Sequence, residues 1–169
     1  MIDILILHVL NKSILTMYGI SKNIKKEFVA FTLPSYGTIS PAIKRLIKAG
    51  AITYQKIMSE GGRPSNYYSI TQEGKKILRE MLIAPISDNP MQFLTNARLR
   101  LCCSAVLEKY EFLELTNMLK YRAEIILQDT KNVVNSTDDF YKKIIYDNLS
   151  CEYKNFITLV EGIERAGNN

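Results

Sequence analysis

Residues 36–71 read YGTISPAIKRLIKAGAITYQKIMSEGGRPSNYYSIT, and the expected fold depends mainly on them. At 100° per residue, the apolar side chains of residues 36–47 gather on one side of a helix, as a packed helical face requires. Lys44, Arg45 and Lys48 point away from that side. The stretch therefore opens with a helix that is apolar on one face and basic on the other.

The ends of this helix are marked by local signals. Pro41 limits where the helix begins, because only the first turn tolerates a residue without an N–H to donate. Thr38 is the expected N-cap, with Ser35 or Ser40 as alternatives. Gly50 follows the last basic residue and can adopt the left-handed conformation that ends a helix.

A β-hairpin is expected after the helix. Residues 51–58 and 66–71 are rich in β-branched and aromatic side chains, and the glycine pair in residues 59–62 is a hairpin signal between two such runs. Alternation along the returning strand turns Tyr67 outward. Arg63, just past the turn, would project from the tip, where a guanidinium suits a phosphate backbone or a minor groove.

Two further helices are expected before residue 36. Apolar residues in segment 2–10 recur with helical spacing, and His8 falls off that stripe, which favours a surface or interface position. Segment 11–16 is interpreted as a polar linker, and segment 18–31 as a second helix that ends at Thr32-Leu33-Pro34. A short break joins this helix to the basic helix that precedes the hairpin. Two helices connected in this way and followed by a hairpin predict a winged helix-turn-helix.

The rest of the chain is expected to be helical and to form a second domain. Thr71 is the expected cap of a fourth helix that ends near Ala84, and the Pro85–Pro90 segment, rich in turn-forming residues, is the clearest boundary. We therefore predict a mostly α protein, with a DNA-binding domain at 1–84 and a long-helix dimerisation domain at 85–169.

The last helix has the spacing of a helix–helix seam, with apolar residues three and four apart. A second apolar stripe beside it exceeds what three helices can bury among themselves, so a second copy of the chain is the expected partner, with a compact monomer as the alternative. The residues expected at this seam are Tyr141, Ile145, Leu149, Tyr153, Phe156, Val160 and Ile163.

Charge is distributed unevenly along the chain. Residues 1–84 hold 12 Lys and Arg against 5 Asp and Glu, whereas residues 85–169 hold 10 against 12. A basic N-terminal half suits a module that binds nucleic acid, although a solvated lysine-rich surface explains the charge equally well. The sequence contains no metal cluster, phosphate loop or paired nucleophile and base, so neither an enzyme nor a cofactor is expected.

Cysteine usage and hydropathy suggest where the protein is found. Three cysteines, two of them adjacent, make no disulfide framework and fit reduced, buried thiols. The longest apolar run near the start, residues 4–10, is too short to span a bilayer and lacks the flanks of a secretory signal. A cytoplasmic protein without membrane contact is expected.

Several short motifs together resemble the PadR (phenolic-acid-decarboxylase repressor) family of bacterial winged-helix regulators. They are Tyr18-Gly19, Gly37-Thr38-Ile39, Pro41 to Leu46, Gly50-Ala51-Ile52, and Gly61-Gly62-Arg63-Pro64 running to Tyr67-Tyr68 and Thr71. Two residues depart from the family pattern. Ser40 stands where the family usually has a tyrosine, and Ser65 stands where a second basic residue of the wing is common.

The resemblance implies a homodimeric repressor that binds a pseudo-palindromic operator in double-stranded DNA. It also implies release by a small molecule or a stress signal that changes the dimer. The alternative is a winged helix that binds protein instead of DNA, whose exposed helix face should be more apolar. The residues expected to contact DNA are Tyr18, Lys22, Tyr36, Thr38, Ser40, Pro41, Lys44, Arg45, Lys48, Arg63 and Tyr67.

Overall fold

The computed structural model describes residues 1–58, 64–86 and 89–167, and its chain forms two compact units. The first comprises Met1–Ala84 and Arg98–Val106, and the second comprises Pro85–Ala97 and Leu107–Asn169. The segment Arg98–Val106, which we expected in the C-terminal domain, thus belongs with the N-terminal unit. The mostly α fold with a winged helix-turn-helix is confirmed.

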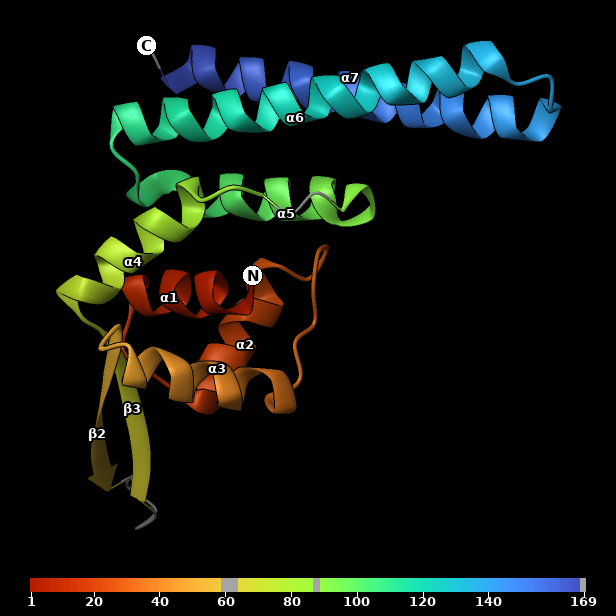
Figure 1. The fold of residues 1–169 in the computed structure, drawn as a ribbon. Helices are drawn as coiled ribbons and strands as arrows, with labels where there is room; N and C mark the ends of the chain where they lie inside the picture. Colours follow the sequence, from red (N-terminus) through yellow and green to blue (C-terminus); the bar gives the residue numbers. More distant parts are fainter. Residues whose placement is uncertain (59–63, 87–88, 168–169) are drawn as a thin grey trace. The chain divides into compact units, whose positions relative to one another are not determined.

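Four helices form most of the first unit (Figure 1). They are α1 (Ile2–Lys12), α2 (Met17–Glu27), α3 (Tyr36–Lys48) and α4 (Gln72–Ile83). Helix α1 lies at the centre of this unit, since every residue from Ile4 to Leu10 is buried and α1 contacts α2, α3 and α4. Helix α3 buries its predicted apolar face through Ile39, Ile43 and Leu46, which leaves its opposite face exposed.

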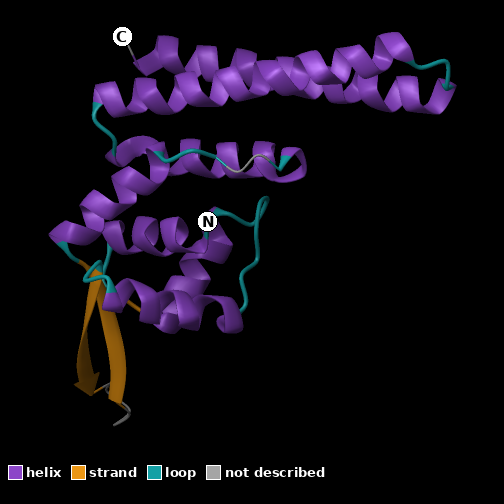
Figure 2. Cartoon of the chain, in the orientation of Figure 1, coloured by secondary structure: helices purple, strands orange, loops and turns teal. Residues whose placement is uncertain are grey.

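The hairpin is part of a three-stranded antiparallel sheet (Figure 2). Strands β1 (Leu15–Thr16), β2 (Ile52–Met58) and β3 (Pro64–Ile70) lie in the order β1-β3-β2. The expected two-stranded wing was therefore incomplete, because the supposed linker 11–16 contributes a short strand. In this register Tyr68 faces Tyr54 on one side and Leu15 on the other.

Helix α3 begins earlier than we predicted. Its N-cap is Ser35, which was one of the two alternatives to Thr38, so Pro41 lies inside the helix, beyond its first turn. The missing proline N–H leaves the carbonyl of Gly37 without its helical donor, and Gly37 is exposed, so water can take that place. The helix ends as expected: Gly50 has φ +69°, with Gly50 N–H donating to Ile47 and Ala51 N–H to Leu46.

Helix α4 is fixed at both ends. The hydroxyl of Thr71 accepts from the N–H of Gly74 at 2.9 Å, which confirms the predicted cap. At the other end, the buried guanidinium of Arg100 donates to the carbonyls of Leu82 and Ala84. A cation at a helix C-terminus complements the helix dipole, and burial lowers the pKa of Arg100 below its ordinary value.

His8 is buried, which corrects the expected surface position. Its Nε2 lies 3.2 Å from a carboxylate oxygen of Glu27 in α2, and its ring packs edge-on against Phe28. Lys12 donates to the same carboxylate at 2.6 Å. Apolar periodicity placed His8 off the stripe of α1, but α1 is covered on all sides, so a polar residue there must find a partner inside.

We predict that His8 makes stability fall at mildly acidic pH. Burial and the charge of Lys12 lower the pKa of His8 from 6.5, against the opposing effect of Glu27. Above that value the imidazole is neutral in both states. As pH falls below it, the unfolded chain takes up a proton that the folded chain resists, so stability is lost between about 6.5 and the folded pKa.

Thermal unfolding followed between about pH 7.5 and pH 5.5 tests this prediction, in the range where His titrates. The His8→Gln variant keeps a donor for Glu27 but cannot titrate, so its melting temperature should vary less with pH. The lowered pKa of Glu27 acts separately, because its stabilisation is lost only as pH falls below about 4.5. Equal pH dependence in the two proteins would contradict the assignment.

The second unit is built on a hairpin of two 28-residue helices, α6 (Lys109–Ser136) and α7 (Phe140–Gly167), which run antiparallel (Figure 1). Lys120 and Glu164 join them at 2.7 Å. Helix α5 (Pro90–Cys103) and a short 3-10 turn, η1 (Ser104–Val106), precede the hairpin. The part of α5 that belongs to this unit packs Phe93 against Tyr153 and Phe156 of α7.

Because of this packing, the seam residues that we assigned to a partner chain fall into two groups, one buried within the chain and one exposed. Tyr153, Phe156 and Val160 are buried within their own chain, so they leave little surface for another. Tyr141 and Ile145, by contrast, expose 77% and 63% of their surface. Leu149 and Ile163 are half-buried. The periodicity was right for a packed helix face, but it did not distinguish a partner chain from α5 and α6.

The cysteines are less buried than we expected. Cys103 is buried, and this raises its pKa to about 12, whereas Cys102 and Cys151 are exposed. None of the helices in the described part of the chain has the length and apolar character that a membrane span needs.

Candidate nucleic-acid interface

The exposed face of α3 carries the strongest concentration of expected contact residues. Lys44 and Lys48 are one turn apart, both are exposed, and neither forms an ion pair with another described residue. Pro41 is exposed and Ser40 is half-buried on the preceding turn. This face, defined by Ser40, Pro41, Lys44 and Lys48, is called the α3 face below. It offers two lysine side chains without ion-pair partners, preceded by Ser40 and Pro41.

Arg45 follows Lys44 on α3 and is also exposed, but it forms an ion pair. Its guanidinium donates to the carboxylate of Asp3 in α1 at 2.8 Å, so this cation is directed toward α1. Thr38, two turns earlier on the same side, lines a hollow of about 540 Å³ with residues of α1 and of the segment 32–35. The ion pair with Asp3 distinguishes Arg45 from the two unpaired lysines, and Thr38, although exposed, borders the hollow beside α1.

The start of α2 adjoins the wing. Tyr18 is 64% exposed and shares a groove of about 290 Å³ with Ser65 and Asn66 of β3. The Thr16 hydroxyl accepts from the N–H of Gly19 at 3.1 Å and thereby fixes the first turn that presents Tyr18. Lys22, one turn further along α2, is exposed. Because β1 pairs with β3, the start of α2, which carries Tyr18 and Lys22, lies next to the wing.

The remaining expected contacts are placed less uniformly. Tyr36 is 44% exposed at the first residue of α3. Tyr67 is half-buried because it pairs with Thr16 of β1 and Gln55 of β2. Arg63, expected at the tip of the wing, lies outside the described residues.

Two residues near this surface were missed by sequence reasoning. Asp3 forms an ion pair with Arg45, yet the two are 42 positions apart, and no local pattern relates them. Asn66 enters the groove beside Tyr18 only because β1 pairs with β3. Asn66 alone had a usable signal, since a polar side chain on the wing is a ready hydrogen-bond donor to phosphate.

We predict that Asp3→Asn raises the affinity for duplex DNA by about two- to fivefold at low salt, because it removes a negative charge and releases Arg45. The fold should be little affected, since an exposed ion pair contributes only about 0–1 kcal/mol. Fluorescence anisotropy of a labelled duplex measures the change. Glu80→Gln, which removes an exposed carboxylate paired with Lys76 in α4, is the matched control. Weaker binding by Asp3→Asn would show that the ion pair supports the interface.

Fold and site together define a winged helix-turn-helix transcriptional regulator, with a basic α3 face beside a β-wing. Residues 6–80 match the model of the Transcriptional regulator PadR-like family, and this part of the chain belongs to that family. The match spans α1 to α4 and the sheet. It contains every residue of the α3 face.

Solved structures were also compared with the chain. PadR of Bacillus subtilis in complex with operator DNA is 22% identical over 97% of both chains, with a TM-score of 0.45. The same protein with p-coumaric acid is 23% identical over 99% of this chain and 98% of that one, with a TM-score of 0.43. A transcriptional regulator from Clostridium thermocellum is 32% identical over 47% of this chain and 76% of that one, with a TM-score of 0.43. No curated protein matches the sequence.

Proposed function

We propose that the protein is a homodimeric repressor that binds a pseudo-palindromic operator and is released by a small molecule or a stress signal. The observation that carries this proposal is the α3 face, whose two unpaired lysines lie on a winged helix-turn-helix of the PadR-like family. Residues 1–84 of the first unit would bind DNA, the second unit would dimerise and bind the effector, and the protein would act in the cytoplasm.

DNA contact follows from the arrangement of the first unit. With α3 in the major groove, Lys44 and Lys48 would meet phosphates or base edges, and Ser40 and Pro41 would lie nearest the bases. Tyr18, Lys22 and the wing groove would contact the backbone on one side, with Tyr36 at the start of α3. Each lysine that meets a phosphate gains affinity by releasing counterions. Arg45 would contribute only after leaving Asp3.

A second copy of the chain would cover the exposed apolar start of α7. Phe140, Tyr141, Ile144 and Ile145 expose 68%, 77%, 52% and 63% of their surface, and adjacent large apolar side chains of this kind mark interaction sites. A twofold dimer through this cluster would bring two DNA-binding units, each with one α3, into the same complex.

Two other functions fit the residues less well. A winged helix that binds protein should expose an apolar α3 face, whereas this face carries Lys44 and Lys48. Catalysis would need a reactive cluster, and in the described residues no group of three or more His, Cys, Asp or Glu could hold a metal. We therefore propose that the protein acts by binding and not by catalysis.

Mass measurement of the chain alone and with DNA from its own upstream region tests the assembly. We expect two chains in solution and two chains on each bound duplex. Replacing Tyr141 and Ile145 together by Glu should yield single chains, because charged side chains would be buried unpaired at the interface. Tyr110→Glu, at an exposed aromatic residue of α6, is the control. A wild-type chain that is monomeric both free and on DNA would contradict the dimer.

A further inference from the structure

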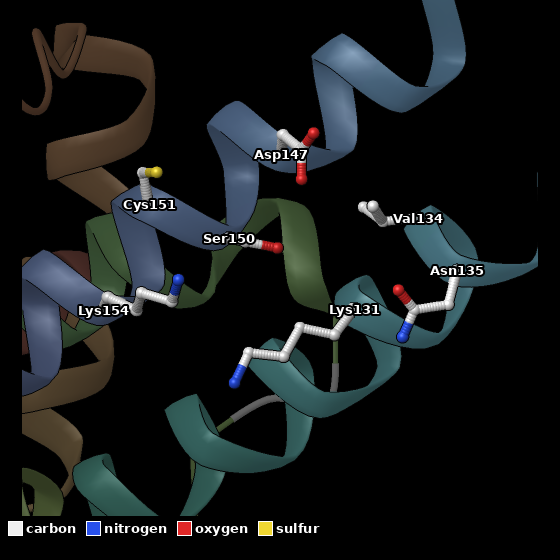
Figure 3. Close-up of a pocket in the computed structure, with 7 residues that line it drawn as sticks. All are labelled: Lys131, Val134, Asn135, Asp147, Ser150, Cys151 and Lys154. Atoms are coloured by element: carbon white, nitrogen blue, oxygen red, sulfur yellow. The ribbon is translucent and has the colours of Figure 1, made fainter. Parts of the chain in front are cut away.

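The second unit has a polar pocket between α6 and α7, of about 310 Å³ (Figure 3). Small-molecule sites in proteins start at about this size, roughly 300 Å³. The pocket lies where α6 ends and α7 begins, next along the chain to the exposed apolar cluster of Phe140 to Ile145. The residues that line it are Lys131, Val134, Asn135, Asp147, Ser150, Cys151 and Lys154.

Ser150 is the most informative of these residues. It exposes only 4% of its surface, and its hydroxyl has no hydrogen-bond partner among the described residues. Figure 3 shows this hydroxyl pointing from α7 into the space between the two helices. Buried hydroxyls in proteins are nearly always hydrogen-bonded, because an unmet one loses its interactions with water. A ligand in the pocket would supply the missing partner.

The charged residues of the pocket are also unpaired. Lys131 comes from α6, Asp147 and Lys154 come from α7, and none of them forms an ion pair or side-chain hydrogen bond with another described residue. Elsewhere along the same hairpin, Lys120 and Glu164 form a bridge of 2.7 Å. Charges that only hold α6 to α7 would be expected to pair in that way.

We propose that this pocket binds a small hydroxycarboxylate. The ammonium groups of the two lysines would hold the ligand carboxylate, because their two positive charges outweigh the single negative charge of Asp147. Ser150 would donate to a ligand oxygen, Asp147 would accept from the ligand hydroxyl, and Val134 would contact its carbon atoms. Because the pocket adjoins the apolar start of α7, its occupation would alter the dimer, and this effector role rests on the proposed function.

Calorimetric titration of the full chain with malate and with lactate tests the site. Wild type should bind at least one of them, Ser150→Ala should bind roughly fivefold less tightly, and Lys154→Gln roughly tenfold less tightly, as expected for removal of a neutral hydrogen bond and of a charge-assisted one. Lys143→Gln removes an exposed lysine of α7 that does not line the pocket and should bind as wild type does. Circular dichroism confirms that each variant is folded.

Three results would overturn the proposal. They are no binding of either acid by wild type, binding by both Ser150→Ala and Lys154→Gln that is as tight as that of wild type, or binding of inorganic phosphate that is as tight as that of the acids. DNA binding measured without ligand separates this proposal from the function. If wild type binds DNA but neither acid, the site fails and the function stands. If it binds an acid through Ser150 but no DNA, the function fails and the site stands.

Discussion

Replacing Lys44 and Lys48 together by glutamine should lower the affinity for duplex DNA by roughly 100-fold at low salt, on the order of tenfold for each phosphate that is no longer neutralised. Both side chains are exposed on the α3 face, and no described carboxylate competes for them. The dependence of log Kd on log salt should also become shallower, by about 0.9 for each such phosphate. Fluorescence anisotropy at several salt concentrations measures both quantities.

The matched control is the double replacement of Lys142 and Lys143, two exposed lysines of α7 in the second unit. It removes the same charge from the chain and should change affinity much less, since these two lysines belong to a unit that is not proposed to contact DNA. Arg45→Gln should also have a smaller effect, because Asp3 already neutralises that cation. Equal decreases in affinity for the two double variants would mean that only net charge matters.

Gly74→Ala should strongly destabilise the first unit. A Cβ at Gly74 would lie 1.9 Å from the carbonyl oxygen of Ala51 and 2.8 Å from its carbonyl carbon. Ala51 is buried, and its oxygen accepts from Thr71 N–H at 3.0 Å, so this backbone has no free space to move into. We expect the free energy of unfolding to fall by at least about 3 kcal/mol, the upper range for overpacking a core.

Thermal unfolding tests this expectation, and Gly162→Ala in α7 is the matched control. Nothing lies within 4 Å of a Cβ at Gly162, so alanine there should stabilise the helix by about 0.5–1 kcal/mol. The two variants make the same chemical change and should shift the melting temperature in opposite directions. A Gly74→Ala protein as stable as wild type would contradict the described junction between Ala51 and α4.

The elements that could be predicted from the sequence are those whose signals are local. The apolar face of α3 lies within one helix, Gly50 needs only its own backbone conformation, and Thr71 reaches just three residues along the chain. The hairpin follows from two β-rich runs and a glycine turn. These short-range rules were enough to predict the winged helix-turn-helix and the helix that presents Lys44 and Lys48.

The features that escaped prediction depend on distant partners. Strand β1 exists because Leu15 pairs with Tyr68, and Arg45 forms an ion pair with Asp3 of α1. The seam of α7 was visible as a stripe, but a stripe does not reveal that Phe93 of α5 covers Phe156. Nothing in the local sequence distinguishes Ser150, whose buried hydroxyl matters only once α6 lies beside it.

Binding of the wild-type chain to DNA from its own upstream region, at low and at higher salt, tests the central claim most directly. We expect a discrete complex in a gel-shift assay at about 50 mM salt that weakens by at least about tenfold at 200 mM, as phosphate contacts through the α3 face require. Absence of any complex at low salt, or a complex indifferent to salt, would contradict the account.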